Sequence, residues 1–196
     1  MPREVELKSV VDDIDECRRR LEAAGARLTF EGRLVDLRYD TADRKLGDAD
    51  QVLRVRSYSG ADGPTVALEW KGPTRYENGY KVRDELSSTA MDAKSVTAIL
   101  ERLGYTVVGE IARDVAQYAL GDASIRFERY AHMDTLVEVE GAPDAIEHAV
   151  SALGIPRDRF SSDRLATFMA RFEARTGERA VVGTGSHVTP SRAAHA

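Results

Sequence analysis

Charged and apolar residues alternate along the predicted strands of this chain. At its start, Glu4, Glu6 and Lys8 alternate with Val5 and Leu7. Because successive side chains of a β-strand point to opposite faces, the charged residues would share one face and the apolar residues the other. A polar side in contact with solvent would explain one such strand. The pattern recurs in later segments, so it needs a more general explanation.

The same alternation, together with turn residues between the apolar runs, predicts the order of the elements. After the first strand, extended segments are predicted at 28–39, 52–57, 65–71, 80–88, 107–111, 113–120, 123–130 and 135–140. Apolar residues at helical spacing predict helices at 10–26, 91–103, 143–153 and 162–176. Loops are predicted at 40–50 and 72–79. These elements form one predicted domain, residues 1–176.

The C-terminal segment has a different composition. From Gly177 onward the chain consists mostly of Gly, Ser, Thr and Ala with scattered charges. Such a segment cannot bury enough apolar surface to order itself, so residues 177–196 are predicted to be a flexible tail. His187 and His195 lie in this tail and are not expected to be ligands.

Composition limits the possible classes of protein. The 196 residues are 42% hydrophobic and 31% charged, with a net charge of -5, which is typical of a globular protein and argues against a general nucleic-acid binder. A single cysteine, Cys17, excludes an internal disulfide and a cysteine-rich zinc site. Because the sequence has no apolar run that could cross a bilayer and no secretory signal, we expect a cytoplasmic protein without a membrane partner.

Charges of both signs at matched strand positions favour a closed sheet over an open one. An open sheet with its polar side in water has no need of paired carboxylates and basic residues in strand after strand. A barrel of about eight strands with a polar interior, covered outside by helices, would explain the pattern and would be an α+β fold. The buried charges would be costly unless complementary ions occupied the interior.

The two sets of charges indicate what those ions would be. The basic set suits a polyanion such as polyphosphate; it comprises Lys8, Arg54, Arg56, Lys71, Arg83 and Arg113. The acidic set would repel that polyanion unless divalent cations lay between them; it comprises Glu4, Glu6, Glu128, Glu138 and Glu140. The pattern therefore indicates a polyphosphate substrate with a divalent metal.

The first strand, Glu4-Val5-Glu6-Leu7-Lys8, resembles the ExExK motif of the CYTH superfamily, the triphosphate tunnel metalloenzymes. The resemblance continues, in the family's order, through the segments 36–41, 53–56, 68–73, 83–85, 103–105, 113–118 and 136–141. It covers roughly residues 3 to 175. It implies an eight-stranded antiparallel tunnel with helices packed on its outside.

The resemblance also implies roles for individual residues. The metal ligands, for two Mg²⁺ or Mn²⁺ ions, would be Glu4, Glu6, Glu138 and Glu140, helped by Glu128 and Glu85. The triphosphate would be bound by Lys8, Arg54, Arg56, Lys71, Lys81, Arg83 and Arg113. The catalytic residues among them would be Lys71, Arg56 and Lys8.

The sequence departs from the family pattern at three positions. Val115 stands where the family often has the second basic residue of a Lys-x-Arg pair, and Glu128 replaces the usual Asp. Arg38 stands where the family often has Tyr. It could supply a replacement positive charge, or it could form a surface pair with Asp36 or Asp40.

The resemblance is greatest to the class IV adenylate cyclase branch. The opening EVELK, the Lys-Gly-Pro after Trp70 and a Leu-Gly-Tyr after the central helix carry this similarity. It favours conversion of ATP to cyclic AMP and pyrophosphate. An alternative is a triphosphatase that hydrolyses thiamine triphosphate, tripolyphosphate or a nucleoside triphosphate.

Two further possibilities stay open at this point. A module that binds a triphosphate without turnover would be consistent with Val115, whereas the four metal-side glutamates argue against it. A homodimer, common in the resembling branch, is also possible.

Overall fold

The computed structural model describes residues 3–184. Its strands are β1 (Arg3–Val10), β2 (Arg27–Thr41), β3 (Val52–Gly60), β4 (Gly63–Lys71), β5 (Arg75–Glu77), β6 (Tyr80–Ala90), β7 (Tyr105–Leu120), β8 (Ala123–Arg129) and β9 (Leu136–Glu140). Its helices are α1 (Ile14–Ala23), α2 (Lys45–Asp48), α3 (Ala93–Arg102), α4 (Pro143–Leu153), the 3-10 helix η1 (Arg157–Arg159) and α5 (Leu165–Thr176).

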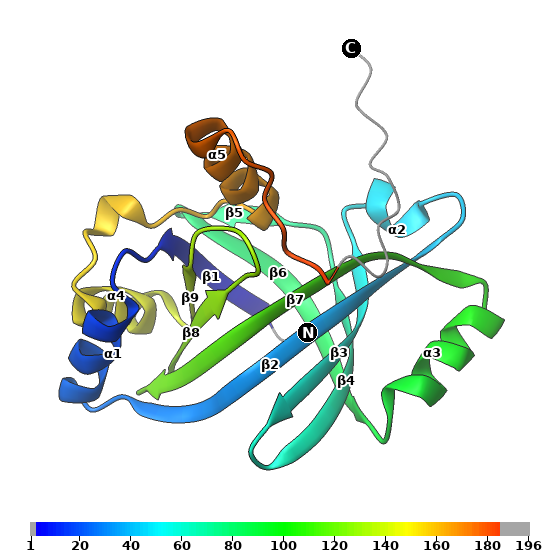
Figure 1. Cartoon of the computed structure of the whole chain (residues 1–196), viewed down its shortest axis with the longest axis horizontal. Coiled ribbons are helices and arrows are strands. Elements are labelled where there is room, and N and C mark those ends of the chain that lie inside the picture. The colour runs from blue at the N-terminus through cyan, green and yellow to red at the C-terminus, as the bar shows by residue number, and fades with distance from the viewer. Residues whose placement is uncertain (1–2, 185–196) are drawn as a thin grey trace.

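Eight of the strands close into an antiparallel barrel, as predicted (Figure 1). Their order around the wall is β1-β9-β8-β7-β2-β3-β4-β6, and β6 pairs with β1 to complete the circle. The short strand β5 extends β6 as a hairpin. Because β1 and β2 are four strands apart in either direction, they lie on opposite sides of the barrel.

The apolar core lies between the barrel wall and the helices. On one side, α1 and α4 pack together against the outward faces of the strands, and Leu7, Ile125 and Val139 are fully buried there (Figure 1). On the other side, α3 covers a second cluster that includes Val55 and Leu100. With the apolar faces turned outward to the helices, the charged faces of the strands line the interior.

The observed element boundaries differ from the predicted ones where local signals compete. Helix α1 begins after Asp13, not at residue 10, because Val10 is still part of β1. The Asp13 side chain caps the helix by accepting a hydrogen bond from the backbone N–H of Glu16 at 2.9 Å. The segments predicted as two strands around Ala112 form one strand, β7, which pairs with β2 along nearly its whole length. The predicted loops at 40–50 and 72–79 contain α2 and β5.

The C-terminal segment packs on the barrel further than its composition predicts. Val181 exchanges backbone hydrogen bonds with His132, and the backbone N–H of Ala112 donates to the carbonyl of Val182 at 2.6 Å. Ala180 is buried. The flexible tail expected from residue 177 is therefore not seen over residues 177–184. Residues 185–196, with His187 and His195, lie outside the described part.

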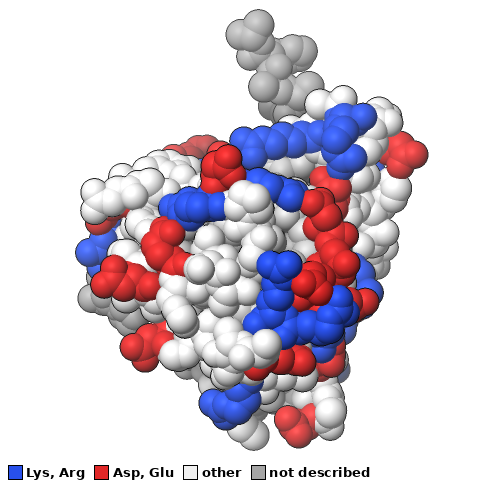
Figure 2. Space-filling model, turned by 90° about the vertical axis from the view of Figure 1, so that its left-hand side faces the viewer, with Lys and Arg blue, Asp and Glu red and all other residues white. Residues whose placement is uncertain are grey.

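The surface over α1 and α4 carries charges of both signs close together, around an uncharged area (Figure 2). Many of these charges pair locally, as in the ion pair between Arg157 and Glu147 at 2.9 Å. In the part of the chain that the structure describes, no helix is long and apolar enough to cross a bilayer.

Candidate active site in the barrel interior

A cavity of about 360 Å³ lies in the barrel interior and is partly open to solvent. Its inner wall carries charged side chains from the strands, whereas Leu53, Val108 and Leu165 contribute apolar surface. The charged residues that line it include Glu6, Lys8, Asp36, Arg38, Arg54, Arg56, Lys71, Lys81, Arg83, Arg113, Arg126, Glu128 and Glu138. All of the basic residues that the sequence predicts to bind the triphosphate are therefore brought together.

Asp36 on β2 organises the arginines at the centre of this wall. Its carboxylate accepts two hydrogen bonds from Arg56, at 2.6 and 2.9 Å, one from Arg113 at 3.1 Å and one from Arg54 at 3.4 Å. Burial alone would raise the pKa of Asp36, but the three guanidinium groups outweigh it and hold that pKa well below its ordinary range. Asp36 is thus a charged anchor that fixes the orientation of three phosphate-binding candidates.

Glu128 on β8 plays a similar role beside this cluster. It accepts hydrogen bonds from Arg113 at 2.7 Å, Arg126 at 3.2 Å and the hydroxyl of Tyr130 at 2.7 Å. Burial opposes ionisation, yet Arg113 and Arg126 lower the pKa of Glu128 from 4.5 to about 2. Its contacts make it a brace for arginines rather than a free ligand.

We expect Glu128 to stabilise the fold above its unfolded-state pKa. Because the folded pKa is the lower one, the stabilisation is present above pH 4.5 and is lost as the pH falls towards 2. The difference corresponds to about 3 kcal/mol. Glu128→Gln should therefore lower the free energy of unfolding at pH 7 and weaken its pH dependence between 4.5 and 2.

Urea unfolding at pH 7, 4 and 3 would check this expectation. Glu16→Gln is the matched control, because Glu16 pairs with Arg19 and Arg20 on the exposed surface of α1. An identical pH dependence in wild type and Glu128→Gln would contradict the assigned role of Glu128.

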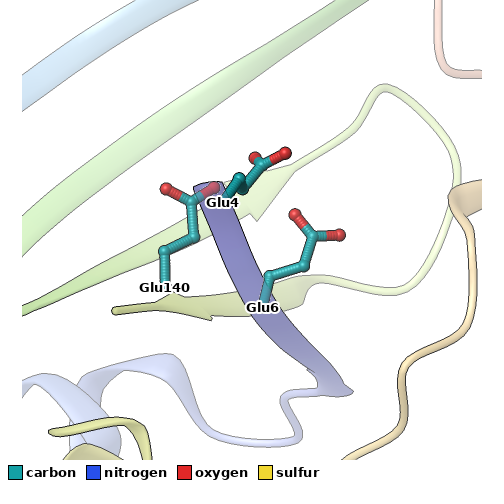
Figure 3. A group of neighbouring side chains, drawn as sticks. All are labelled: Glu4, Glu6 and Glu140. Atoms are coloured by element: carbon teal, nitrogen blue, oxygen red, sulfur yellow. The ribbon is translucent and has the colours of Figure 1, made fainter. Parts of the chain in front are cut away.

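Three carboxylates gather at the β1 side of the barrel (Figure 3). Glu4 and Glu6 lie on β1 and Glu140 on β9, and an oxygen from each lies within 4.8 Å of the others. The Glu4 side chain is only 6% exposed, and its Oε2 is buried without a hydrogen-bond partner among the described residues. Burial raises the pKa of Glu4 to about 8, and the nearby carboxylates of Glu6 and Glu140 add to the effect although Lys71 opposes it.

This carboxylate trio (Glu4, Glu6, Glu140) fits a divalent cation. Mg²⁺ and Mn²⁺ prefer oxygen ligands, and a bound cation would supply the orphaned Glu4 oxygen with a partner and relieve the repulsion. The trio contains three of the predicted metal ligands. The three carboxylates therefore offer suitable ligands for a metal ion, whose positive charge would offset their mutual repulsion.

The other predicted metal ligands have basic partners. Glu138 forms ion pairs with Lys8 and Arg126. Glu85 lies 3.4 Å from the Lys71 ammonium and 3.8 Å from Arg54. Among the described residues, none of Glu138, Glu128 and Glu85 belongs to the group that could share one ion with the trio.

The three predicted lysines connect the carboxylates to the cavity. Lys8 and Lys81 donate to the same Glu6 oxygen, at 2.7 and 2.5 Å, and Lys71 donates to Glu4. Lys71 also lies beside Glu85, so its ammonium group faces two carboxylates and acts as a hydrogen-bond donor.

Arg83 has a different environment from the other predicted arginines. Its guanidinium donates to the carbonyls of Gly72 at 2.6 Å and Asp50 at 2.7 Å. It therefore connects the loop after β4 with the loop before β3 while it lines the cavity.

Sequence reasoning did not assign four residues that contribute to the site. Asp36 and Arg126 are as deeply buried as the predicted residues, Glu69 accepts from Arg54 at 2.6 Å, and Tyr130 donates to Glu128. The signal was available for the first three, because each lies on the charged face of its strand. Their partners could not be identified without the register between strands.

Val115, one of the departures from the family pattern, is a buried residue of the barrel wall. It is buried on β7, directly opposite Glu128 on β8. The position that often carries a second basic residue in the family is apolar here.

The closed antiparallel barrel of eight strands with helices packed on its outside is the triphosphate tunnel fold. The profile of the CYTH domain matches residues 2–150, and the chain belongs to this family.

The individual relatives are distant. A Methanocaldococcus jannaschii protein described as a candidate adenylate cyclase is 23% identical over 137 residues, which are 70% of this chain and 75% of that protein. The solved structure of a candidate adenylate cyclase from Vibrio parahaemolyticus is similar with a TM-score of 0.73 and 18% identity, over 85% of this chain and 97% of that one. The solved structure of a candidate adenylyl cyclase from Hippeastrum, described as having a dominant triphosphatase activity, is similar with a TM-score of 0.62 and 18% identity. The similarity covers 89% of this chain and 96% of that one. The two solved structures support the fold alone.

Proposed function

We propose that this protein is a divalent-metal-dependent enzyme that acts on an organic triphosphate inside the barrel, with cyclisation of ATP to cyclic AMP and pyrophosphate as its first candidate reaction. One observation carries the proposal: basic side chains line a cavity inside the barrel, and the carboxylate trio adjoins it, because Glu6 lines the same cavity and Lys71 pairs with Glu4. This combination suits an anion that is bound together with a cation.

Each set of residues has a separate task in this proposal. Glu4, Glu6 and Glu140 would hold the metal, which supplies neutralisation of the charge on the phosphate oxygens. Arg56 and Arg54 present donors to the substrate with their orientation fixed by Asp36. Phosphoryl chemistry relies mainly on positioning and charge stabilisation, so such preoriented donors are the main contribution of the protein.

The apolar part of the cavity lining supports an organic substrate over bare polyphosphate. Val52, Leu53 and Leu165 form apolar wall in the same cavity as the arginines. An apolar wall offers nothing to a phosphate chain, but it can contact a base or another organic group. The similarity to a protein described as a candidate adenylate cyclase supports ATP as the first substrate to test.

Hydrolysis is the second candidate reaction. A hydrolase would hold a water in line with the terminal phosphorus, and Lys71 between Glu4 and Glu85 is a candidate to position it. The Hippeastrum protein, which shares this fold, is described as having a dominant triphosphatase activity, so hydrolysis is to be tested beside cyclisation. Thiamine triphosphate and tripolyphosphate are its further candidate substrates.

Product analysis by chromatography separates these possibilities. The protein would be incubated with ATP, thiamine triphosphate or tripolyphosphate, with Mg²⁺ or Mn²⁺ and with a chelator as control. Cyclic AMP and pyrophosphate from ATP would support the cyclase, and orthophosphate from any substrate would support the triphosphatase. Absence of every product despite tight triphosphate binding would contradict an enzyme and leave a binding module.

A further inference from the structure

Arg38 on β2 differs from the other arginines of the tunnel because it has no acidic partner. Its guanidinium donates no hydrogen bond to any described residue, and its Nε is buried without a partner. The two acids predicted to pair with it are engaged elsewhere. Asp36 binds three other arginines, and Asp40 accepts from the backbone amides of Leu46 at 3.0 Å and Gly47 at 2.9 Å. The expected surface pair is therefore absent, and Arg38 lines the cavity.

The position of Arg38 leaves room for a ligand beside it. Along β2 it lies opposite Arg54 on β3 and opposite Gly109 on β7, so the three residues share one level of the barrel wall. Gly109 presents no side chain, and a Cβ placed there would meet no atom within 4 Å. The wall is thus open next to the unpaired guanidinium.

The charge of Arg38 is only partly compensated by its surroundings. Burial and the neighbouring cation Arg54 lower its pKa to about 10 although Asp36 opposes them, so it keeps its charge at neutral pH. A half-buried guanidinium whose Nε is buried without a hydrogen-bond partner is costly, and natural proteins retain such groups mainly at functional sites. The other central arginines, Arg54, Arg56 and Arg113, are already compensated by carboxylates.

We propose that Arg38 is a specificity-determining residue of this chain that binds a phosphate oxygen of the polyphosphate substrate. The inference rests on the proposed triphosphate site and adds the residue at which the tunnel has an uncompensated donor group. A guanidinium offers several donors in a planar fork that matches phosphate oxygens, so it can bind an anion that a neutral side chain there would not hold.

Binding of a cleavage-resistant analogue tests the proposal without dependence on turnover. The probe is bis-methylene triphosphonate, whose P–C–P bridges resist hydrolysis, titrated calorimetrically in the presence of Mg²⁺. We expect Arg38→Gln to bind it about ten- to a hundredfold more weakly, because a charge-assisted hydrogen bond is lost. Arg38→Lys should recover part of the affinity. The matched control is Arg33→Gln, on the same strand but paired at the surface with Asp114 at 3.1 Å, and it should bind like wild type.

Thermal unfolding of the ligand-free variants distinguishes binding from a structural role. Because Arg38 has no partner to lose, Arg38→Gln should melt at the same temperature as wild type or higher. Unchanged affinity in this variant, or weaker binding accompanied by a lower melting temperature, would overturn the assignment of Arg38. If wild type itself fails to bind the probe, the proposed triphosphate site falls, and this inference falls with it.

Discussion

Glu6→Gln is expected to abolish metal-dependent turnover, with kcat/KM reduced by about a thousandfold or more. The change keeps the shape of the side chain but removes one charge from the carboxylate trio. Burial works against ionisation of Glu6, yet Lys81 and Lys71 lower its pKa, so it is a carboxylate at neutral pH. A carboxamide in its place would bind a cation more weakly, and it would replace the ion pairs with Lys8 and Lys81 by weaker hydrogen bonds.

Two measurements are needed for Glu6→Gln. Product formation gives the activity, and Mn²⁺ titration followed by electron paramagnetic resonance gives the metal affinity, which should fall in parallel. Circular dichroism should show an unchanged fold, since the amide oxygen can still accept from both lysines. Glu16→Gln, outside the barrel on α1, is the control for the loss of one glutamate charge. Near-wild-type activity of a folded Glu6→Gln protein would refute the barrel interior as the active site.

Arg56→Ala should have the second-largest effect, a loss of activity of about a hundred- to a thousandfold. Arg56 is the arginine bound to Asp36 through two nitrogens, and it lines the cavity with N–H groups that Asp36 does not use. Removing it also breaks a buried ion pair, at a cost of about 3 kcal/mol. The fold should survive, because Asp36 keeps Arg54 and Arg113 as partners.

Comparison with Arg56→Lys shows how the guanidinium acts. Lysine retains the charge but lacks the planar fork, so its activity should lie between those of Arg56→Ala and wild type. The control is Arg171→Ala on α5, which removes an exposed ion pair with Asp163 and should leave activity unchanged. Melting curves of all three variants would show whether lost activity is simply lost structure. A folded Arg56→Ala protein with normal kcat/KM would contradict the role of Arg56.

The fold was largely predictable because its strands repeat one simple pattern. Alternation in segments such as 4–8 and 52–57 identifies both the strands and the face that carries charge. The closed barrel followed from the presence of both signs on that face. What the pattern could not show was the continuity of β7 through residue 112, because it depends on pairing with β2, a strand distant in the sequence.

The site was less predictable than the fold because its pairings cross between strands. Asp36 takes Arg54 and Arg56 from β3 and Arg113 from β7, a choice that only the register of the assembled barrel determines. The same choice leaves Arg38 without an acid. Residue type and strand face therefore predicted which residues line the site. Which of these residues form ion pairs with each other, and which do not, depends on the strand register and is shown only by the structure.

The pairing of β1 with both β9 and β6 has a consequence for biosynthesis. The strand β1 leaves the ribosome before its partner β9, which ends at Glu140, so one edge of β1 stays unpaired until β9 has been made. Long-range pairings of this kind make folding slow, and the carboxylate trio cannot assemble before β9 is in place. A nascent chain shorter than this would carry Glu4 and Glu6 without Glu140, so the complete set of three carboxylates would arise only when β9 joins β1 in the barrel.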